Sequence, residues 1–406
     1  MSMDRRDFLK QSSLGLAAVP GLGILSSLES FHHLPMAQDR ILLILELAGG
    51  NDGLNTVIPY EDDAYHKARP RIRVQQGQHS LGKGIALHPR MAAMARLFKE
   101  GDLAVVQGVG YPQPNRSHFR SMDIWQSARP DLETPRIGWL GLAADQLAKN
   151  GLNLPAMALG GSELPLCLRA RKVTVPTLDS LADYQLARAG LGDKAITKKK
   201  KLEEELSRAR KTDDTLDALI RATARQAYLG AEKLRRSIDA YKAKVAYPKT
   251  DLGKRFEMAS RVASSPLGTR ILHLRQGGYD THAGQNRTHG NLLGEMSEAL
   301  GAFARDMAAR GMWDRCVVLV FSEFGRRVRE NQSRGTDHGT AGPVFLAGGK
   351  VHGGLHGKNP SLTKLDKGDL ISGTDYRSIY QEILETWLGV KASPILKGKY
   401  PRLKLV

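Results

Sequence analysis

The sequence predicts an α/β domain built on a doubly wound, mostly parallel sheet. Near-continuous apolar runs such as ILLILEL, at residues 41–47, and CVVLVF, at residues 316–321, indicate strands with both faces buried. Helical patterns alternate with these runs, which is the order that βαβ units require. Ligands are expected beyond the carboxyl ends of such strands.

The predicted elements cover most of the chain in that alternating order. The first strand is expected to run from Arg40 to the glycine pair Gly49 and Gly50. Further strands are expected at residues 103–110, 155–161, 164–175, 269–276, 316–325 and 342–349, and helices at 88–102, from 115 or 117 to 128, at 291–315 and at 376–390. Gly101 closes the first helix, and polar cap candidates precede the second. From about residue 180 to residue 263 the composition shifts to Lys, Arg, Glu, Ala and Leu, which predicts an inserted helical cap.

The first 37 residues resemble a twin-arginine export signal. Arg5 and Arg6 form the pair in MDRRDFLK, and a moderately apolar stretch follows. We expect recognition by the twin-arginine export machinery, cleavage after Ala37, and a single mature domain, residues 38–406, that is periplasmic or extracellular. The alternative is a basic start to a cytoplasmic helix. No later stretch approaches the roughly 20 apolar residues of a membrane helix, so no transmembrane anchor is expected.

Charge and composition narrow the choice of partners. The chain of 406 residues has a formal net charge of +18, and the basic and acidic residues of the first 37 balance. Such a surface attracts anionic small molecules or polymers. Aromatic residues make up only 6% of the chain and no nucleic-acid motif is present, so nucleic acid is not expected. Cys316 opens an apolar run and is expected to be buried, and no CxxC motif occurs.

Polar residues that suit a metal follow four of the predicted segments. These residues are Glu46, Asn51 and Asp52 at the first strand, Asp280 and His282 after residues 269–276, Glu323 after residues 316–321, and Asp337 and His338 in the next loop. A parallel sheet brings such ends to one edge. Carboxylates combined with imidazoles favour a divalent transition metal, zinc or manganese rather than magnesium. Their joint occurrence predicts a metal site.

Each of these features also has a structural interpretation. Glu46 could be a buried carboxylate paired with an arginine, the GGNDG segment a turn, and Asp337 with His338 a loop pair. His289, seven residues beyond His282, has no supporting pattern and is expected to lie in a loop.

Ser117, in NRSHF, is the candidate nucleophile. It follows a predicted strand and opens a helix, where free amides and the helix dipole stabilise negative charge. The alternative is an ordinary N-cap, which is a frequent role of serine. Its neighbours Arg116 and His118 are candidates for contacting an anionic substrate.

Several motifs together resemble the exported family catalogued as domain of unknown function 1501. They are RRDFLK, ILELAGGNDGLNTVIPY, NRSHFRSMDIWQSA, GGYDTH, FSEFGR, DHGT and TDYRSIYQEILETWLG, and the resemblance runs from about Arg40 onward. That family is similar to the alkaline phosphatase and sulfatase superfamily. The resemblance implies a three-layer α/β/α fold, a metal site at the strand ends and a nucleophile at a helix start.

The same resemblance implies roles for individual residues. Glu46, or its rivals Asn51 and Asp52, corresponds to the acidic ligand of the first strand, and Ser117 to the nucleophile. Asp280, His282 and His338 correspond to ligands of one metal. The late Asp-His pair of the superfamily becomes Glu323 followed by Phe324.

Two departures from the superfamily matter. Phenylalanine cannot ligate a metal, so the centre would hold one ion, or two with an oxygen-rich second position or with an imidazole borrowed from His118. NRSHF also lacks the Cys/Ser-x-Pro-x-Arg sequence of sulfatases, which argues against a sulfatase of the usual kind.

The function expected from these observations is an exported, metal-dependent hydrolase of phosphate or other anionic esters, with Ser117 as nucleophile. Two alternatives stand beside it. One is a non-catalytic envelope protein or acidic-polymer-binding protein on the same fold with a degraded metal site. The other is a metal hydrolase that uses bound water, in which Ser117 is only a cap.

Overall fold

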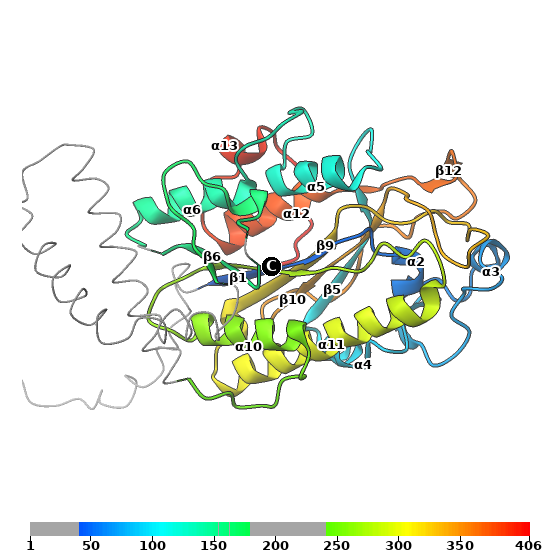
Figure 1. Ribbon diagram of the computed structural model, residues 1–406, viewed down its shortest axis with the longest axis horizontal. Helices are drawn as coiled ribbons and strands as arrows, with labels where there is room; N and C mark the ends of the chain where they lie inside the picture. Colours follow the sequence, from blue (N-terminus) through cyan, green and yellow to red (C-terminus); the bar gives the residue numbers. More distant parts are fainter. Residues whose placement is uncertain (1–39, 153, 162, 179–240) are drawn as a thin grey trace, which may run out of the picture. The chain divides into compact units, whose positions relative to one another are not determined.

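A mixed sheet of nine strands organises the domain (Figure 1). In a computed structural model, which describes residues 40–178 and 241–406 except 153 and 162, the strands follow the order β11-β5-β10-β9-β1-β8-β6-β7, and β14 also pairs with β5. Their bounds are β1 Ile41–Leu47, β5 Leu103–Gly110, β6 Ala156–Leu159, β7 Thr177–Leu178, β8 Ile271–Gln276, β9 Cys316–Ser322, β10 Gly342–Ala347, β11 Gly354–His356 and β14 Thr374–Asp375.

The sheet is mostly parallel. β1 pairs in parallel with β8 on one side and β9 on the other, and only β10 runs antiparallel to its two neighbours, β5 and β9. The predicted α/β class with a mostly parallel sheet is confirmed. β1 also explains the near-continuous apolar run, because its alternate residues enter two different hydrophobic cores, one on each face of the sheet.

Helices cover both faces and make the domain three-layered (Figure 1). On one face lie α4, α10 and α11, which pack in the core that contains Leu43 and Leu45 of β1. On the other lie α5, α6, α12 and α13, which pack in the core that contains Leu42 and Ile44. Their bounds are α4 Ala92–Glu100, α5 His118–Ser127, α6 Trp139–Lys149, α10 Asp251–Ala263, α11 Gln285–Ala309, α12 Tyr376–Glu382 and α13 Ser393–Leu396.

Smaller elements lie between these layers and at the rim. A three-stranded sheet contains β2 Val57–Ile58, β3 His79–Gly82 and β4 Ile85–Leu87, and a two-stranded sheet contains β12 Leu365–Asp366 and β13 Asp369–Leu370. The remaining helical segments of the described residues are α2 Gly53–Thr56, α3 Asp63–Ala68, the 3-10 turns η2 Leu166–Leu168 and η3 Trp313–Arg315, and the π-helical segment η4 Ile383–Trp387. Cys167 and Cys316 are free and buried, as predicted for Cys316.

Three element predictions were wrong in detail. The strand expected at residues 164–175 is a 3-10 turn followed by irregular chain. α11 begins at Gln285, six residues before the predicted start, so His289 lies in a helix and is buried rather than in a loop. α12 ends at Glu382, where the π-helical segment begins.

The predicted insertion needs a shorter boundary. Its last part, α10, packs through Phe256 and Met258 into the main core and belongs to a helix layer. Asp306 of α11 holds the preceding segment by accepting hydrogen bonds from the hydroxyl of Tyr247 at 3.0 Å and the backbone N–H of Lys244 at 3.0 Å. The rest of the predicted cap, residues 179–240, and the export signal lie outside the described residues.

None of the helices in the described segments is both long enough and apolar enough to span a bilayer.

Candidate metal centre

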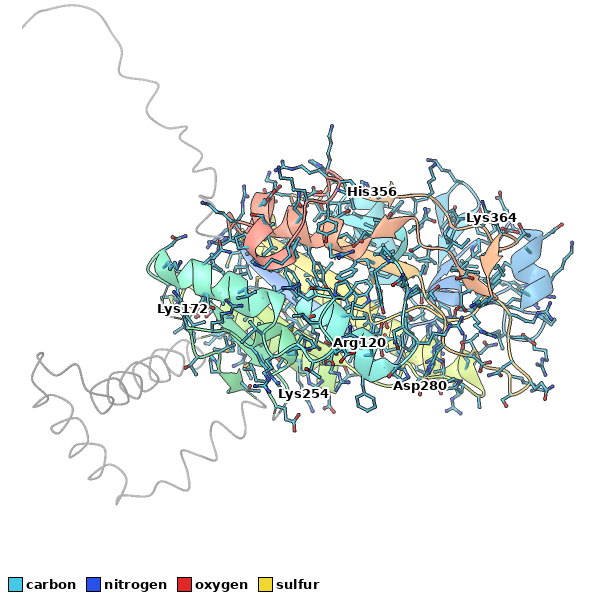
Figure 2. The ribbon with its side chains drawn as sticks, turned by 90° about the horizontal axis from the view of Figure 1, so that it is seen from above. Arg120, Lys172, Lys254, Asp280, His356 and Lys364 are labelled. Carbon is cyan, nitrogen blue, oxygen red and sulfur yellow. The ribbon has the colours of Figure 1, made fainter. Side chains whose placement is uncertain are left out.

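The loops after β1 and β8 pack against each other at the carboxyl edge of the sheet. A Cβ atom on Gly49 would lie 2.4 Å from the backbone nitrogen of Asp280, a distance that no side chain tolerates. The backbone N–H of Tyr279 donates to the carbonyl of Ala48 at 3.2 Å. The glycine pair after β1 therefore permits a close backbone approach, and that approach places Asp280 at the sheet edge. Asp280 lies beside the end of α5, the helix that carries Arg120 (Figure 2).

Three imidazoles converge on one oxygen of Asp280. The Nε2 atoms of His282, His338 and His118 lie 3.0, 3.2 and 3.5 Å from Asp280 Oδ1. The Nε2 atoms of His282 and His338 are also 3.0 Å apart. Ligand atoms of His118, Asp280 and His338 all lie within 4.8 Å of one another. Asp280, His282 and His338 were predicted as ligands, and the structure brings all three together.

The second nitrogen of each imidazole contacts a hydrogen-bond acceptor. Nδ1 of His338 lies 2.9 Å from the carbonyl oxygen of Arg116, Nδ1 of His282 lies 3.3 Å from Asp337 Oδ1, and Nδ1 of His118 lies 2.8 Å from Glu323 Oε1. A carbonyl oxygen or a carboxylate only accepts, so these contacts favour the neutral tautomer that carries its proton on Nδ1.

In that tautomer the three Nε2 atoms present lone pairs toward Asp280 Oδ1. Lone pairs of nitrogen and oxygen at these distances repel unless a cation lies between them. Metal-ligating histidines commonly donate their other N–H to a carboxylate or carbonyl, as these three do. A tetrahedral ion with bonds of about 2.0–2.2 Å separates its ligand atoms by about 3.3–3.6 Å. The distances from the three Nε2 atoms to Asp280 Oδ1, 3.0, 3.2 and 3.5 Å, are close to that separation.

His118 gives a second sign that the residues fit a metal ion. Its Nε2 atom is buried and has no hydrogen-bond partner among the described residues. Burial lowers the pKa of His338, and the charges of Arg326 and His118 lower it further, against the opposing effects of the Asp280 carboxylate and the carbonyl of Arg116. A neutral imidazole is the form that binds metal.

Asp280 is held in its ionised form. Burial alone would raise its pKa, but the hydrogen bond and charge of Arg326, together with the contacts to His338 and His282, lower it to about 2. The carboxylate is therefore charged at any physiological pH and is available as an anionic ligand.

Glu323 supports the centre from behind. Its Oε1 atom accepts from the backbone N–H of Gly49 at 2.9 Å as well as from His118, and its Oε2 atom accepts from the hydroxyl of Ser322 at 2.9 Å. The carboxylate is buried, and both of its oxygens are in hydrogen-bond contact. Glu323 thus orients His118 in the arrangement described here, and it reaches the cluster through that imidazole.

Phe324 packs against two of the imidazoles. Its ring centroid lies 4.9 Å from those of both His118 and His338. The ring forms an apolar wall beside the cluster. His118, which the sequence suggested as a borrowed imidazole, does contact both Glu323 and Asp280.

Ser117 lies between two residues that touch the cluster, the carbonyl of Arg116 and the ring of His118. It occupies the N-cap position of α5, but its hydroxyl makes no capping hydrogen bond. The side chain is exposed. The Arg116 guanidinium is paired with Asp369, so it is not free in this arrangement.

Comparisons with known proteins identify the family of the chain. Residues 176–386, just over half of it, match the family described as "Protein of unknown function (DUF1501)". The chain belongs to this family. A comparison with curated proteins finds no match.

Solved structures that resemble this DUF1501 chain are distant. The zinc complex of the C-terminal periplasmic domain of EptC from Escherichia coli has 10% identity and a TM-score of 0.40, covering 89% of this chain and 83% of that one. The lipoteichoic acid synthase LtaP from Listeria monocytogenes has 10% identity and a TM-score of 0.44, covering 89% and 75%. A protein in the alkaline phosphatase superfamily from Vibrio parahaemolyticus has 10% identity and a TM-score of 0.43, covering 89% and 69%.

Glu46 of the DUF1501 chain lies apart from the cluster. It points to the face covered by α5, where Gln126 donates to it at 2.6 Å and Arg275 lies 3.1 Å away. Burial raises the pKa of Glu46, but His273 and Arg275 outweigh that effect and the net shift is downward. The structure therefore agrees with the interpretation of Glu46 as a buried, paired carboxylate.

Asn51 and Asp52 enter a buried network below the cluster. Asp52 accepts from Arg69 at 2.6 Å and from Gln285, and Asn51 accepts from His289 at 2.9 Å. Burial raises the pKa of Asp52, but Arg69, His289 and Gln285 bring it below its usual value. Neither residue is brought to the three imidazoles.

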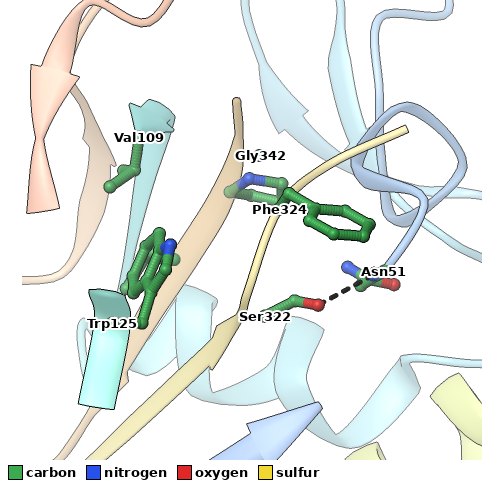
Figure 3. Close-up of a pocket in the computed structure, with 8 residues that line it drawn as sticks. Asn51, Val109, Trp125, Ser322, Phe324 and Gly342 are labelled. Atoms are coloured by element: carbon green, nitrogen blue, oxygen red, sulfur yellow. Dashed lines mark hydrogen bonds between the residues drawn. The ribbon is translucent and has the colours of Figure 1, made fainter. Parts of the chain in front are cut away.

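A small cavity lies beside this network and has Asn51 in its lining (Figure 3). It has a volume of about 10 Å³, which suits one water molecule at most. Asn51, Ser322, Phe324 and Trp125 line it, and the hydroxyl of Ser322 accepts from the backbone N–H of Asn51 at 2.8 Å. The cavity is too small for a substrate.

Proposed function

We propose that this protein is a metal-dependent hydrolase of phosphate esters or other anionic esters. The observation that carries the proposal is the set of three Nε2 atoms directed at Asp280 Oδ1, each from a ring whose Nδ1 is held by an acceptor. Such a set has the composition of a zinc or manganese site, since it combines imidazole nitrogens with a carboxylate oxygen.

The residues that would hold the ion are Asp280, His282, His338 and His118. When bound, the ion would act as a Lewis acid and stabilise negative charge on the attacking oxygen and on the ester. Glu323 and Asp337 would keep the rings in position, because both accept an N–H from a ligating histidine.

Ser117 is the proposed nucleophile. Its exposed hydroxyl makes no capping contact, which is expected if the group reacts and unexpected if it serves the helix. Ser117 Oγ would bond to phosphorus while the ester oxygen leaves with the electron pair of its bond and takes up the hydroxyl proton. Water would then release phosphate from Ser117 and restore the hydroxyl, so the two reaction steps need no other reactant.

A pocket beside the cluster offers room for the alcohol part of the ester. It measures about 210 Å³, and its walls include Tyr111, Pro114, Leu370 and Ile371. Phe324 lines the pocket and also packs on His118 and His338. A substrate whose phosphate faces the cluster would thus reach this pocket with its leaving group.

The decisive experiment compares the metal-loaded mature wild type with Ser117→Ala on p-nitrophenyl phosphate and bis(p-nitrophenyl) phosphate. We expect hydrolysis by the wild type and a loss of at least about 100-fold in kcat in the variant. Ser80→Ala, at another exposed serine, is the matched control and should keep full activity. Full activity of Ser117→Ala would leave water as the nucleophile.

A non-catalytic protein that binds acidic polymers is the second candidate. The ion pair between Arg116 and Asp369 favours it, because the arginine next to Ser117 is already neutralised. It predicts that the metal-loaded wild type hydrolyses neither substrate yet retains an acidic polysaccharide on a column.

Export by the twin-arginine route is part of the proposal. Arg5 and Arg6 in the first 37 residues support it. Replacing both by lysine should leave the precursor inside the cell, and fractionation with an antibody against the mature domain would measure this. Unchanged export of that variant would contradict the route.

A further inference from the structure

Arg326 is a buried cation directly beside the cluster of proposed metal ligands. Its side chain is fully shielded from solvent, whereas the side chain of Asp280 is 48% exposed. The guanidinium donates to Asp280 Oδ1 at 2.6 Å and lies 3.5 Å from Nε2 of His282. It is therefore a fixed positive charge in contact with the proposed ligands.

Backbone carbonyls from three loops hold this guanidinium in place. Nε donates to Gly50 at 2.6 Å, one terminal nitrogen donates to Thr336 at 2.9 Å, and the other donates to Gly49 and to Tyr279. With its N–H groups satisfied by rigid loop carbonyls, the side chain cannot swing away without leaving several buried acceptors unpaired. The loop backbone therefore fixes the position of the positive charge of Arg326 in the site.

The other carboxylates near the cluster are already engaged. Glu323 is occupied by the backbone of Gly49, by His118 and by Ser322, and Asp337 accepts from Asn331 at 3.1 Å as well as contacting His282. Among the residues that the structure describes, His118, Asp280 and His338 form the one group of three or more His, Cys, Asp or Glu ligands close enough to share an ion. No second set of free ligands is therefore present among the described residues, and the positive charge of Arg326 would repel a second ion.

We propose that Arg326 takes the place of a second cation, so that the centre holds one divalent ion and not two. This inference rests on the proposed metal centre and goes beyond it, because it fixes the number of ions and assigns the reason to a residue. Arg326 acts as a positioning residue: it orients Asp280 and excludes another cation by charge repulsion.

Metal stoichiometry tests the inference without any use of activity. The mature protein is dialysed against zinc at micromolar and at millimolar concentration, and bound zinc per chain is measured by elemental mass spectrometry. We expect one ion per chain at both concentrations. Two ions per chain in the wild type would overturn the inference but leave the metal centre intact. No bound ion would instead remove the proposed function.

Variants of Arg326 test the assigned cause. Arg326→Lys keeps the charge and should stay at one ion, whereas Arg326→Gln removes the charge and should admit a second, weaker ion in millimolar zinc. If both variants fold, judged by circular dichroism, and both bind one ion, Arg326 is not what limits the count.

The imidazole of His118 gives an independent check. In a single centre, His118→Ala removes one ligand, so it lowers the affinity for the one ion and leaves the stoichiometry at saturation unchanged. Manganese-loaded wild type should likewise show the electron paramagnetic resonance spectrum of isolated ions. A spectrum of coupled pairs, or a fall from two ions to one in the variant, contradicts the inference.

Discussion

His282 Nε2 and His338 Nε2 lie 3.0 Å apart although 56 residues separate them in the chain. Two loops make this possible. A Cβ on Gly335 would lie 2.3 Å from the backbone of His282, so a glycine is required there, and the side chain of Asn331 donates to the carbonyl of His282 at 2.9 Å. The contact between the two imidazoles is thus built into the backbone of the loops that follow β8 and β9.

Replacing Glu323 by glutamine should weaken the metal centre without removing a ligand. Glutamine has the size of glutamate but accepts more weakly from His118, so the imidazole is less firmly oriented. We expect zinc affinity to fall by about 10–100-fold, as measured by competition with a chromophoric chelator. Glu385→Gln, at an exposed ion pair with Arg402, is the matched control and should bind zinc as the wild type does. Equal zinc affinity in the wild type and both variants would contradict the role of Glu323 in orienting His118.

Gly50 should tolerate no side chain. Its φ is +70°, and a Cβ there would lie 2.2 Å from Phe324 and 3.2 Å from Nε of Arg326. Gly50→Ala therefore adds overpacking to backbone strain and should cost about 2–5 kcal/mol of the free energy of unfolding. Gly82→Ala, with a φ of +85° and nothing within 4 Å, carries the strain alone and should cost about 1 kcal/mol. Urea denaturation measures both, and equal losses would contradict the packing described around Phe324.

Stability should fall as the pH drops below neutrality. Burial of His289 lowers its pKa to about 4, against the opposing charge of Asp52. An unfolded chain binds this proton near pH 6.5, so the folded state keeps its full stability above that pH and loses it as the pH falls toward 4. Between pH 7.5 and pH 5 the loss from this residue is about 2 kcal/mol.

Urea unfolding at pH 7.5 and pH 5.0 measures the effect. His289→Gln should be less stable at pH 7.5 and should lose less on acidification than the wild type. Part of the pH dependence should persist, because burial also lowers the pKa of His88 to about 4. His352→Gln, at an exposed position, should keep the slope of the wild type. An unchanged slope in His289→Gln would show that this histidine does not titrate as described.

The sequence was sufficient to locate the site because parallel strands end at one edge of the sheet. Asp280, His282 and His338 follow apolar runs that clearly predict buried strands. Ser117 lies among polar cap candidates that predict the start of a helix. These positions need only the order of the elements and their direction.

The sequence was insufficient wherever the direction of a side chain decides. Glu46 follows Leu42 and Ile44 in the alternation of β1, so it faces α5 and not the site, and this parity becomes visible only once both cores are known. Arg326 is one of 60 basic residues, and no local pattern distinguishes the one that is buried. His289 was misread because the start of α11 carries no capping signal: its N-cap is Gly284, in the left-handed conformation.

The metal content of the purified mature protein tests the central claim most directly. Wild type and the His282→Ala/His338→Ala double variant are produced in medium with zinc and manganese, and bound metal is measured after extensive dialysis. The structure predicts stoichiometric metal in the wild type and none in the double variant, with circular dichroism showing that both are folded. A wild type without metal, or a folded double variant that retains it, would contradict the metal centre.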